Sequence, residues 1–521
     1  MLGGSSAING QAFIPTSKAG IDAWEKLGNP GWDWEDMAPY YRKFHTLTVP
    51  PEPVRHHMGL EYIDDKIRGT SGPLQVSFSD SADDPLPNAW FKTFQTLGFG
   101  LTGDPFSGQV TGGYNSPGTI HPVTKERSYS AIAYYQPASQ QPNLHLLTGA
   151  NVHTIVLEKT DASGAVAATG VKFTREEKEV VVRARKEVIV AAGAFQSPKL
   201  LELSGIGSAD LLGSLGIDTI VDNPGVGENL QDHLMTGFSF EVKDGVKTID
   251  DLARNDHAAM QAAMGAYMAN KSGPFANPGV NSIAFMPLVN IVDTDNEVKS
   301  KKPLEESHAQ ASDSTLKCFI GSLNKSSDKG TAMLYTYPAQ GNFEVGGGAN
   351  PKDITKATMP GNFITIGVCL LQPMSRGAVH LTSANPKQDP SIDPQYLSKE
   401  LDVKVFARHL QYLQTLIKTQ PLASFLKPDG KRSSPDIDLK NLDAIKEFVR
   451  TTAISNWHPV GTCAMLPKDK GGVVSEKLVV YGTKNLRVVD ASIFPTITRG
   501  NPISSVYAVA EKAADLIKAD N

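Results

Sequence analysis

The amino-acid sequence predicts a protein of mixed class, in which an α/β part is interleaved with an α+β part. Three observations predict this. The chain has 521 residues, 40% of them hydrophobic, which is enough apolar material for more than one core. Strand-like alternation over 150–193 passes directly into a helical pattern, as in α/β units. Residues 236–450 show a different sequence pattern, in which polar loops separate helical segments from strand-like runs.

Hydrophobic periodicity places the individual elements along the chain. Alternating or short apolar runs predict strands over 152–157, 168–174, 179–184, 187–192, 363–371, 378–381 and 485–491. Apolar residues three and four apart predict helices over 88–97, 193–204, 258–268, 403–418 and 503–518. Pro198 is expected in the first turn of the helix over 193–204, where a missing N–H costs little.

Composition excludes several classes of function. The net charge is −5 and no Lys/Arg block occurs, so neither nucleic acid nor an anionic membrane is an expected partner. The longest apolar runs are far shorter than the ~18 residues of a spanning helix. A soluble protein is therefore expected, with the cytoplasm and secretion both open. Cys318, Cys369 and Cys463 include no C-x-x-C pair, so no metal site is predicted.

Two glycine-rich segments are candidates for ligand binding. The G-x-G-x-x-G match at 98–103 follows a predicted helix instead of a strand, so a dinucleotide site is not expected there. The opening loop over 2–10 contains Gly3, Gly4, Ser5 and Asn9, which would let a backbone approach a ligand closely and supply short donors. The alternative is an ordinary surface turn, and the residues alone favour that alternative.

A strand–turn–helix unit spans 187–207, and a second strand over 485–491 ends near Asp490. In parallel sheets, ligands bind at the carboxyl ends of strands. The Asp490 carboxylate could bind a ligand hydroxyl there, or it could cap the turn that follows. The unit over 187–207 could equally be a plain packing unit, and periodicity does not separate these readings.

The C-terminal region holds two further candidates. His458, preceded by Trp457, can accept a proton near neutral pH, although a single histidine beside an aromatic residue is more often a hydrogen-bonded core residue. Asn501 and Pro502 precede the last helix and match its N-cap and first position. That capping role explains both residues, and the positive potential of a helix N-terminus would also stabilise a negatively charged ligand.

Taken together and in this order, these segments resemble the glucose–methanol–choline (GMC) oxidoreductases. The loop over 2–10 resembles the first family signature, and 193–207 resembles the second. The run over 225–233, Gly-Val-Gly-Glu-Asn-Leu-Gln-Asp-His, is another family segment. The segments over 458–465 and 485–502 resemble the C-terminal catalytic block. The resemblance spans nearly the whole chain and is weakest over 236–450.

The resemblance implies a domain organisation. A Rossmann-like FAD-binding domain would be discontinuous, and the other domain would carry an antiparallel sheet with helices. Family members normally begin further upstream with a strand, a G-x-G-x-x-G turn and an acidic ribose partner, so the N-terminal part of this domain is expected to be missing. The FAD-binding domain is assigned to 1–45, 120–235 and 451–521, the substrate-binding domain to 236–450, and a surface excursion or lid to 46–119.

The resemblance also implies a reaction. The enzyme would be an FAD-dependent alcohol oxidase or dehydrogenase that acts on the CH–OH group of a small alcohol and passes electrons to O₂ or a quinone. His458 would be the base, and Asn501 would hydrogen-bond the same substrate oxygen. The implied FAD contacts are Gly3, Gly4, Ser5, Asn9, Val152, Trp457, Asp490, Ala491 and Pro502.

Two alternatives remain open at the level of sequence. The first is a non-redox lyase or cyclase on the same scaffold that also uses His458 as a base; alcohol would then leave the flavin oxidised. The second is a truncated, inactive form that cannot hold FAD. If the N-terminal part is missing, a version extended upstream should retain more flavin.

Overall fold

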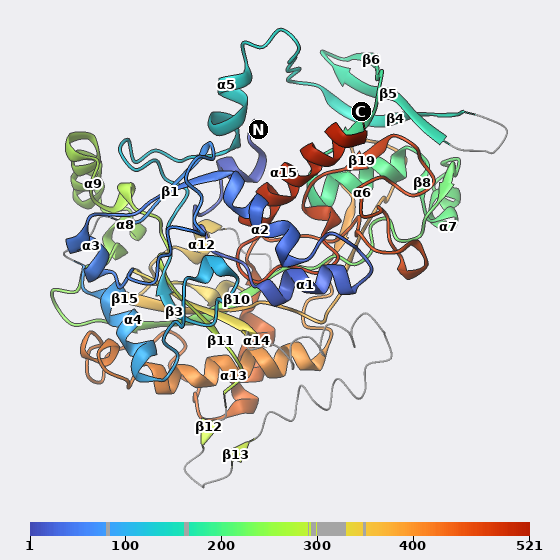
Figure 1. Ribbon diagram of the computed structural model, residues 1–521. Coiled ribbons are helices and arrows are strands. Elements are labelled where there is room, and N and C mark those ends of the chain that lie inside the picture. The colour runs from blue at the N-terminus through green and yellow to red at the C-terminus, as the bar shows by residue number, and fades with distance from the viewer. Residues whose placement is uncertain are drawn as a thin grey trace.

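The computed structural model describes residues 1–79, 84–160, 166–289, 291–292, 298–299, 330–346 and 351–520. Cys318 lies outside these ranges. The predicted mixture of α/β and α+β structure is confirmed: a short parallel pair with its helix lies in one half and an antiparallel sheet in the other (Figure 1). Two large, separate clusters of buried apolar side chains correspond to these halves. The predicted domain boundaries stay a prediction.

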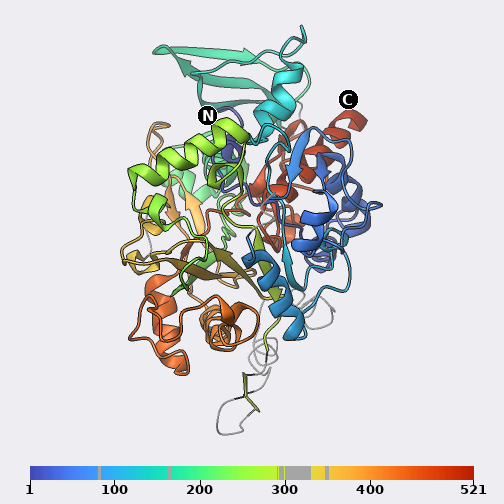
Figure 2. The same cartoon turned by 90° about the vertical axis from the view of Figure 1, so that its left-hand side faces the viewer.

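The antiparallel half is built on a six-stranded sheet. Its strands, in order, are β18 (Ile454–Ser455), β10 (Leu234–Glu241), β15 (Phe363–Leu370), β14 (Ala332–Tyr337), β11 (Ser282–Met286) and β3 (Gly112–Asn115). Every neighbouring pair is antiparallel. Helices α13 (Glu400–Leu416) and α14 (Leu442–Thr452) pack together near this sheet (Figure 2). Their apolar faces bury Phe406, Leu410 and Phe448.

The other half contains the strand–turn–helix unit predicted from sequence. Strand β7 (Val188–Val190) pairs in parallel with β19 (Leu486–Val488), and β7 leads into α6 (Gly193–Leu203). Strands β4 (Asn151–Lys159), β5 (Val166–Arg175) and β6 (Lys178–Arg183) form an antiparallel sheet at the edge of the molecule (Figure 1). The C-terminal helix α15 (Ile503–Asp520) packs on α2 (Trp34–Lys43), beside a core that buries Trp24 and Trp32.

The predicted helices are confirmed as α4 (Leu86–Thr96), α6, α9 (His257–Asn270), α13 and α15, and the predicted strands as β4 to β7, β15, β16 (Ala378–His380) and β19. The remaining elements are shorter or irregular. They are α1 (Lys18–Lys26), β1 (His45–Thr48), α3 (Glu52–His57), β2 (Leu74–Ser77), α5 (Gln136–Ala138), β8 (Ile206–Gly207), α7 (Ala209–Ser214), β9 (Val221–Asp222), α8 (Asp250–Ala253), β12 (Ile291–Val292), β13 (Val298–Lys299), α12 (Pro351–Ile354) and β17 (Ser391–Asp393).

One expectation about α6 was wrong. Pro198 lies more than one turn inside the helix, not in its first turn, because the helix begins at Gly193. Proline has no N–H, so the carbonyl of Ala194, four residues earlier, loses its helical donor. The Thr462 hydroxyl replaces that donor at 2.6 Å. A side chain from the C-terminal block therefore compensates for the proline inside the helix.

Candidate functional site

The run over 225–233 joins the parts of the C-terminal block. Gln231 forms backbone hydrogen bonds in both directions with Val460. Its side-chain Nε2 donates to the Pro495 carbonyl at 3.2 Å, and its Oε1 accepts from the Ile497 amide at 3.1 Å. One glutamine thus connects the turn that carries His458 to the segment that leads to Asn501.

His458 is held by both its backbone and its ring. Its amide donates to Asp232 Oδ1 at 2.9 Å, and its Nδ1 lies 3.0 Å from Nδ1 of His233. Burial, together with the neighbouring His233, lowers the pKa of His458 well below its usual value. The imidazole is therefore neutral at physiological pH and is able to accept a proton.

Trp457 lies just before His458, in a left-handed conformation with φ 56°. Its amide donates to Ser455 Oγ at 2.8 Å, which fixes the turn. The Trp457 side chain is 48% exposed. An exposed indole next to the candidate base is available to a ligand, and its predicted contact with the cofactor stays a prediction.

The capping role expected for Asn501 is wrong. Helix α15 begins at Ile503, and the first helical carbonyl to accept a bond is that of Pro502, from the Val506 amide at 2.8 Å. Asn501 is therefore one position too early to cap the helix. Its Oδ1 is buried and accepts no hydrogen bond within the part of the chain that the structure describes. A buried amide oxygen in this state suits a ligand-binding role.

The opening loop over 2–10 is held by hydrogen bonds on one side, and its backbone is exposed on the other. Gly3 and Gly4 have φ values of 93° and 53°, and a Cβ on Gly4 would have no heavy atom within 4 Å. Ser6 Oγ donates to the Gly3 carbonyl at 2.5 Å, and Asn9 Oδ1 accepts from Arg127 at 2.6 Å. Gly4 and Ser5 are exposed. The backbone at Gly4 is therefore accessible to a flat ligand, and the hydrogen bonds of Ser6 and Asn9 keep the loop in place.

Three other predicted cofactor contacts lie on the turn after β19 and on β4. Asp490 accepts from the Gly193 amide at 2.9 Å, Ser197 Oγ at 2.5 Å and the Ser492 amide at 2.8 Å, so it does cap the turn after β19. A role of Asp490 toward a ribityl hydroxyl stays a prediction. Ala491 begins that turn, and Val152 lies on β4 with 39% of its side chain exposed.

The observed residues fit the isoalloxazine half of a flavin. An open glycine loop, a neutral imidazole and an unsatisfied amide oxygen match what a flat, hydrogen-bonding ring system with an alcohol substrate requires.

The G-x-G-x-x-G match at 98–103 follows α4, as expected from sequence, and does not connect a strand to a helix.

Sequence reasoning missed the role of His233. Its ring is fully buried, contacts His458, and places Nε2 2.9 Å from the Leu371 carbonyl oxygen; it also lies within hydrogen-bonding reach of the Thr498 backbone. His233 therefore connects the base to the segment three residues before Asn501. The available signal was the end of the 225–233 run, where three hydrogen-bonding side chains, Gln-Asp-His, stand in a row.

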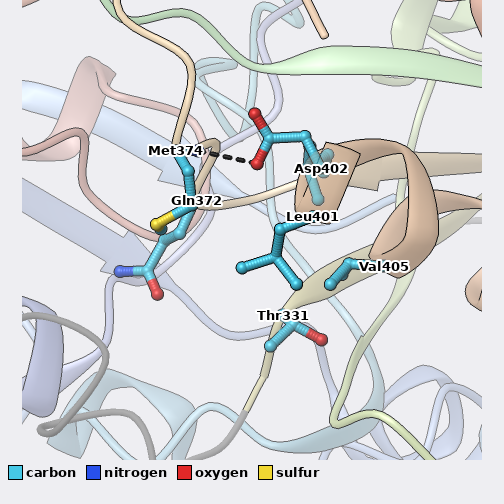
Figure 3. Close-up of a pocket in the computed structure, with 7 residues that line it drawn as sticks. Thr331, Gln372, Met374, Leu401, Asp402 and Val405 are labelled. Atoms are coloured by element: carbon cyan, nitrogen blue, oxygen red, sulfur yellow. Dashed lines mark hydrogen bonds between the residues drawn. The ribbon is translucent and has the colours of Figure 1, made fainter. Parts of the chain in front are cut away.

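A small pocket lies beside β15 and α13, and none of the candidate site residues named above lines it (Figure 3). Its lining residues are Thr331, Leu370, Gln372, Met374, Leu401, Asp402 and Val405. The Asp402 carboxylate accepts from the Met374 and Ser375 amides, at 2.7 and 2.8 Å, and Thr331 is bonded to His409. The Asp402 and Thr331 groups are thus used within the protein, whereas Nε2 of the lining residue Gln372 is buried without a partner in the part of the chain that the structure describes.

Across the described ranges, no cluster of three His, Cys, Asp or Glu side chains has the arrangement of a metal site. Within the same ranges, no helix combines the length and apolar character needed to span a bilayer.

Comparison with known proteins gives concordant matches. Two family models, both described as GMC oxidoreductase, match residues 1–235 and 373–510. The dehydrogenase mpl7 of Monascus purpureus is 33% identical over 538 residues, covering 100% of this chain and 83% of that protein. An FAD-dependent oxidoreductase from Chaetomium thermophilum superposes with a TM-score of 0.84 at 27% identity, covering 100% and 86%. A fungal aryl-alcohol oxidase gives 0.80 at 26% identity, covering 100% and 86%. The resemblance inferred from sequence is confirmed.

Proposed function

Since the chain belongs to the GMC oxidoreductase family, we propose that it oxidises the CH–OH group of a small alcohol, with His458 as the base. The cofactor of this oxidoreductase is FAD. When bound, FAD supplies the acceptor for the hydride that leaves the alcohol carbon. O₂ or a quinone would then take up the electrons, since similar proteins include both an oxidase and a dehydrogenase.

The observation that carries the proposal is the neutral, anchored imidazole of His458. It accepts the alcohol O–H proton as the carbon loses its hydride, so negative charge does not accumulate on the oxygen. The Asn501 Nδ2–H donates to the same oxygen and orients it. The support for this assignment is that Oδ1 of the same amide group is buried without a protein partner among the described residues, which leaves the Asn501 side chain available to a ligand.

The residues proposed to hold FAD are of three kinds. The open loop provides backbone groups, the turn after β19 provides the Asp490 carboxylate, and the exposed Val152 and Trp457 provide contact surface, whereas Pro502 is buried just before α15. The proposed contacts are Gly3, Gly4, Ser5, Asn9, Val152, Trp457, Asp490, Ala491 and Pro502.

Anaerobic reduction of the FAD-loaded enzyme tests the proposal. Aromatic alcohols, aliphatic alcohols and sugars are mixed in turn with the enzyme, and the loss of flavin absorbance is followed. At least one class should bleach the flavin. In His458→Gln the bleaching should slow by about 10²–10⁴-fold, the range for general-base catalysis, at unchanged flavin content.

A matched variant is His409→Leu, which replaces another buried histidine, on α13. It should reduce the flavin at the wild-type rate. If no alcohol bleaches the flavin while an alcohol is still converted, the enzyme is a lyase or cyclase. If His458→Gln reacts at the wild-type rate, another group is the base.

A further inference from the structure

Each ring nitrogen of His233 has a partner within hydrogen-bonding distance, and the ring also approaches the backbone of Thr498. Nε2 lies 2.9 Å from the Leu371 carbonyl oxygen, and Nδ1 lies 3.0 Å from Nδ1 of His458. The rings meet edge to face, with centroids 5.2 Å apart and an interplanar angle of 84°. The His233 ring is fully buried, so water does not compete for either nitrogen.

The protons on the two rings follow from these partners. A carbonyl oxygen can only accept, so His233 must carry its proton on Nε2. Burial lowers the pKa of His233 to about 4, so the ring is neutral and its Nδ1 is an acceptor. The hydrogen bond between the two Nδ1 atoms then requires the proton to be on His458 Nδ1. Since His458 is neutral as well, its Nε2 keeps a lone pair.

The neighbouring backbone fixes the same arrangement. Asp232, next to His233, accepts from the His458 amide, from Ser455 Oγ at 2.5 Å and from Tyr396 Oη at 2.6 Å. The Asn456 amide donates to the His233 carbonyl at 2.8 Å. Two consecutive residues therefore hold the main chain and the ring of the candidate base.

We propose that His233 is a positioning residue that holds His458 as its Nδ1–H tautomer and leaves Nε2 free to take the substrate proton. The inference rests on the proposed role of His458 as base. The proton moves from the alcohol oxygen to Nε2, and the resulting imidazolium still donates through Nδ1 to the neutral His233. Without an acceptor at that point, the Nε2–H tautomer becomes available, and it cannot accept a proton at Nε2.

Two substitutions of His233 distinguish the loss of its hydrogen-bond acceptor from the loss of the volume of its ring. The side-chain amide introduced by His233→Asn can place its Oδ1 where the ring Nδ1 stood, whereas His233→Leu offers no acceptor. The Leu variant is expected to lose on the order of 10²-fold in kcat with KM little changed, because only the proton transfer is impaired. The Asn variant should stay within about tenfold of wild type. His409→Leu again serves as the matched loss of a buried histidine.

The second readout does not depend on turnover or on bound FAD. In ¹⁵N-histidine-labelled protein, nitrogen chemical shifts distinguish a protonated from an unprotonated ring nitrogen, and His458→Gln assigns the signals. Wild type and His233→Asn should carry the His458 proton on Nδ1, and His233→Leu should shift population to Nε2. Circular dichroism confirms that each variant is folded.

The outcomes separate the two claims. Wild-type His458 protonated on Nε2, or an unchanged tautomer in His233→Leu, overturns the role of His233. Equal loss of kcat in the Asn and Leu variants overturns it as well, since a purely structural role predicts that result. Should His458→Gln be fully active while the tautomer still responds to His233, the base assignment fails and the positioning contact stands.

Discussion

At the scale of single residues, the polar side chains of the candidate site differ among themselves in how fully they are hydrogen-bonded. Asp490 and Asn9 have several protein partners, whereas Oδ1 of Asn501 has none among the described residues. A buried polar atom without a partner costs about 1–3 kcal/mol. Proteins retain such a cost where a ligand supplies the missing partner on binding. We therefore expect a substitution of Asn501 to lower activity without lowering the stability of the ligand-free protein.

Replacing Asn501 with alanine tests whether activity falls while stability does not. The flavin reduction rate should fall on the order of 10²-fold, the effect of losing one hydrogen bond to a developing negative charge. The free energy of unfolding of the ligand-free protein should stay equal or rise, because the unsatisfied oxygen is removed. Urea unfolding and anaerobic stopped-flow absorbance measure the two quantities.

Asn229→Ala is the control for the Asn501 prediction. Asn229 Nδ2 donates to the carbonyls of Gly461 and Pro495, at 3.2 and 3.3 Å, so its loss should destabilise the fold. A destabilised Asn501→Ala protein with a normal reduction rate would contradict the proposed role.

At the scale of elements, the turn that carries His458 is tied to helix α6 by one hydroxyl. Thr462 Oγ1 supplies the donor that Pro198 cannot give to the Ala194 carbonyl. The Thr462 carbonyl accepts from the Gly227 amide at 2.9 Å, which ties the same turn to the 225–233 run. The turn that carries the proposed base is thus fixed by two contacts, neither of which involves the His458 side chain.

A double-mutant cycle tests the tie to α6. Thr462→Val should lower the free energy of unfolding by about 1–3 kcal/mol, since a buried carbonyl loses its donor. Pro198→Ala restores an N–H four residues after Ala194, so the Val substitution should cost much less in that background. Urea titration of all four proteins gives the coupling. Strictly additive costs would show that the hydroxyl does not replace the helical bond.

The elements also show how far sequence reasoning reaches. Helices such as α13 and α15, and strands such as β15, were predictable because their periodicity is local. The position of Pro198 inside α6 was not, because the compensating donor lies 268 residues away in sequence. His458 and Asn501 were chosen by resemblance, but His233 was missed. Its contact with His458 spans 225 residues, and no local pattern encodes it.

At the scale of the whole molecule, the order of the strands in a sheet and the packing of the two halves depend on contacts between residues far apart in sequence. Strand β10 pairs with β15 and β18, which lie more than a hundred residues later in the chain. The fold class could be inferred from the mixture of local patterns, whereas the order of the strands could not. The run over 225–233 also takes part in a charged contact between distant segments, since Glu228 from this run and Glu202 from α6 meet at His380 on β16.

The pH dependence of stability follows from that contact. Hydrogen bonds from His380 to Glu202 and Glu228, at 2.7 and 3.0 Å, raise the pKa of His380 from 6.5 to about 9. A raised folded-state pKa means that the stabilisation is fully present below pH 6.5 and is lost as pH rises through 9. His380→Gln should therefore cost about 1–2 kcal/mol at pH 6, after allowance for solvent screening on the Glu228 side, and little above pH 9.5.

Urea midpoints of wild type and His380→Gln between pH 6 and pH 10 measure this convergence. His409→Leu provides the comparison, because burial lowers the pKa of His409 to about 3 and the ring stays neutral over the whole range. Its cost should not change between pH 8 and pH 10, where the His409 ring is neutral in both the folded and the unfolded chain. If the His380→Gln curve instead runs parallel to wild type, His380 contributes packing alone, and the charge pairing between α6, β16 and the 225–233 run does not stabilise the folded molecule.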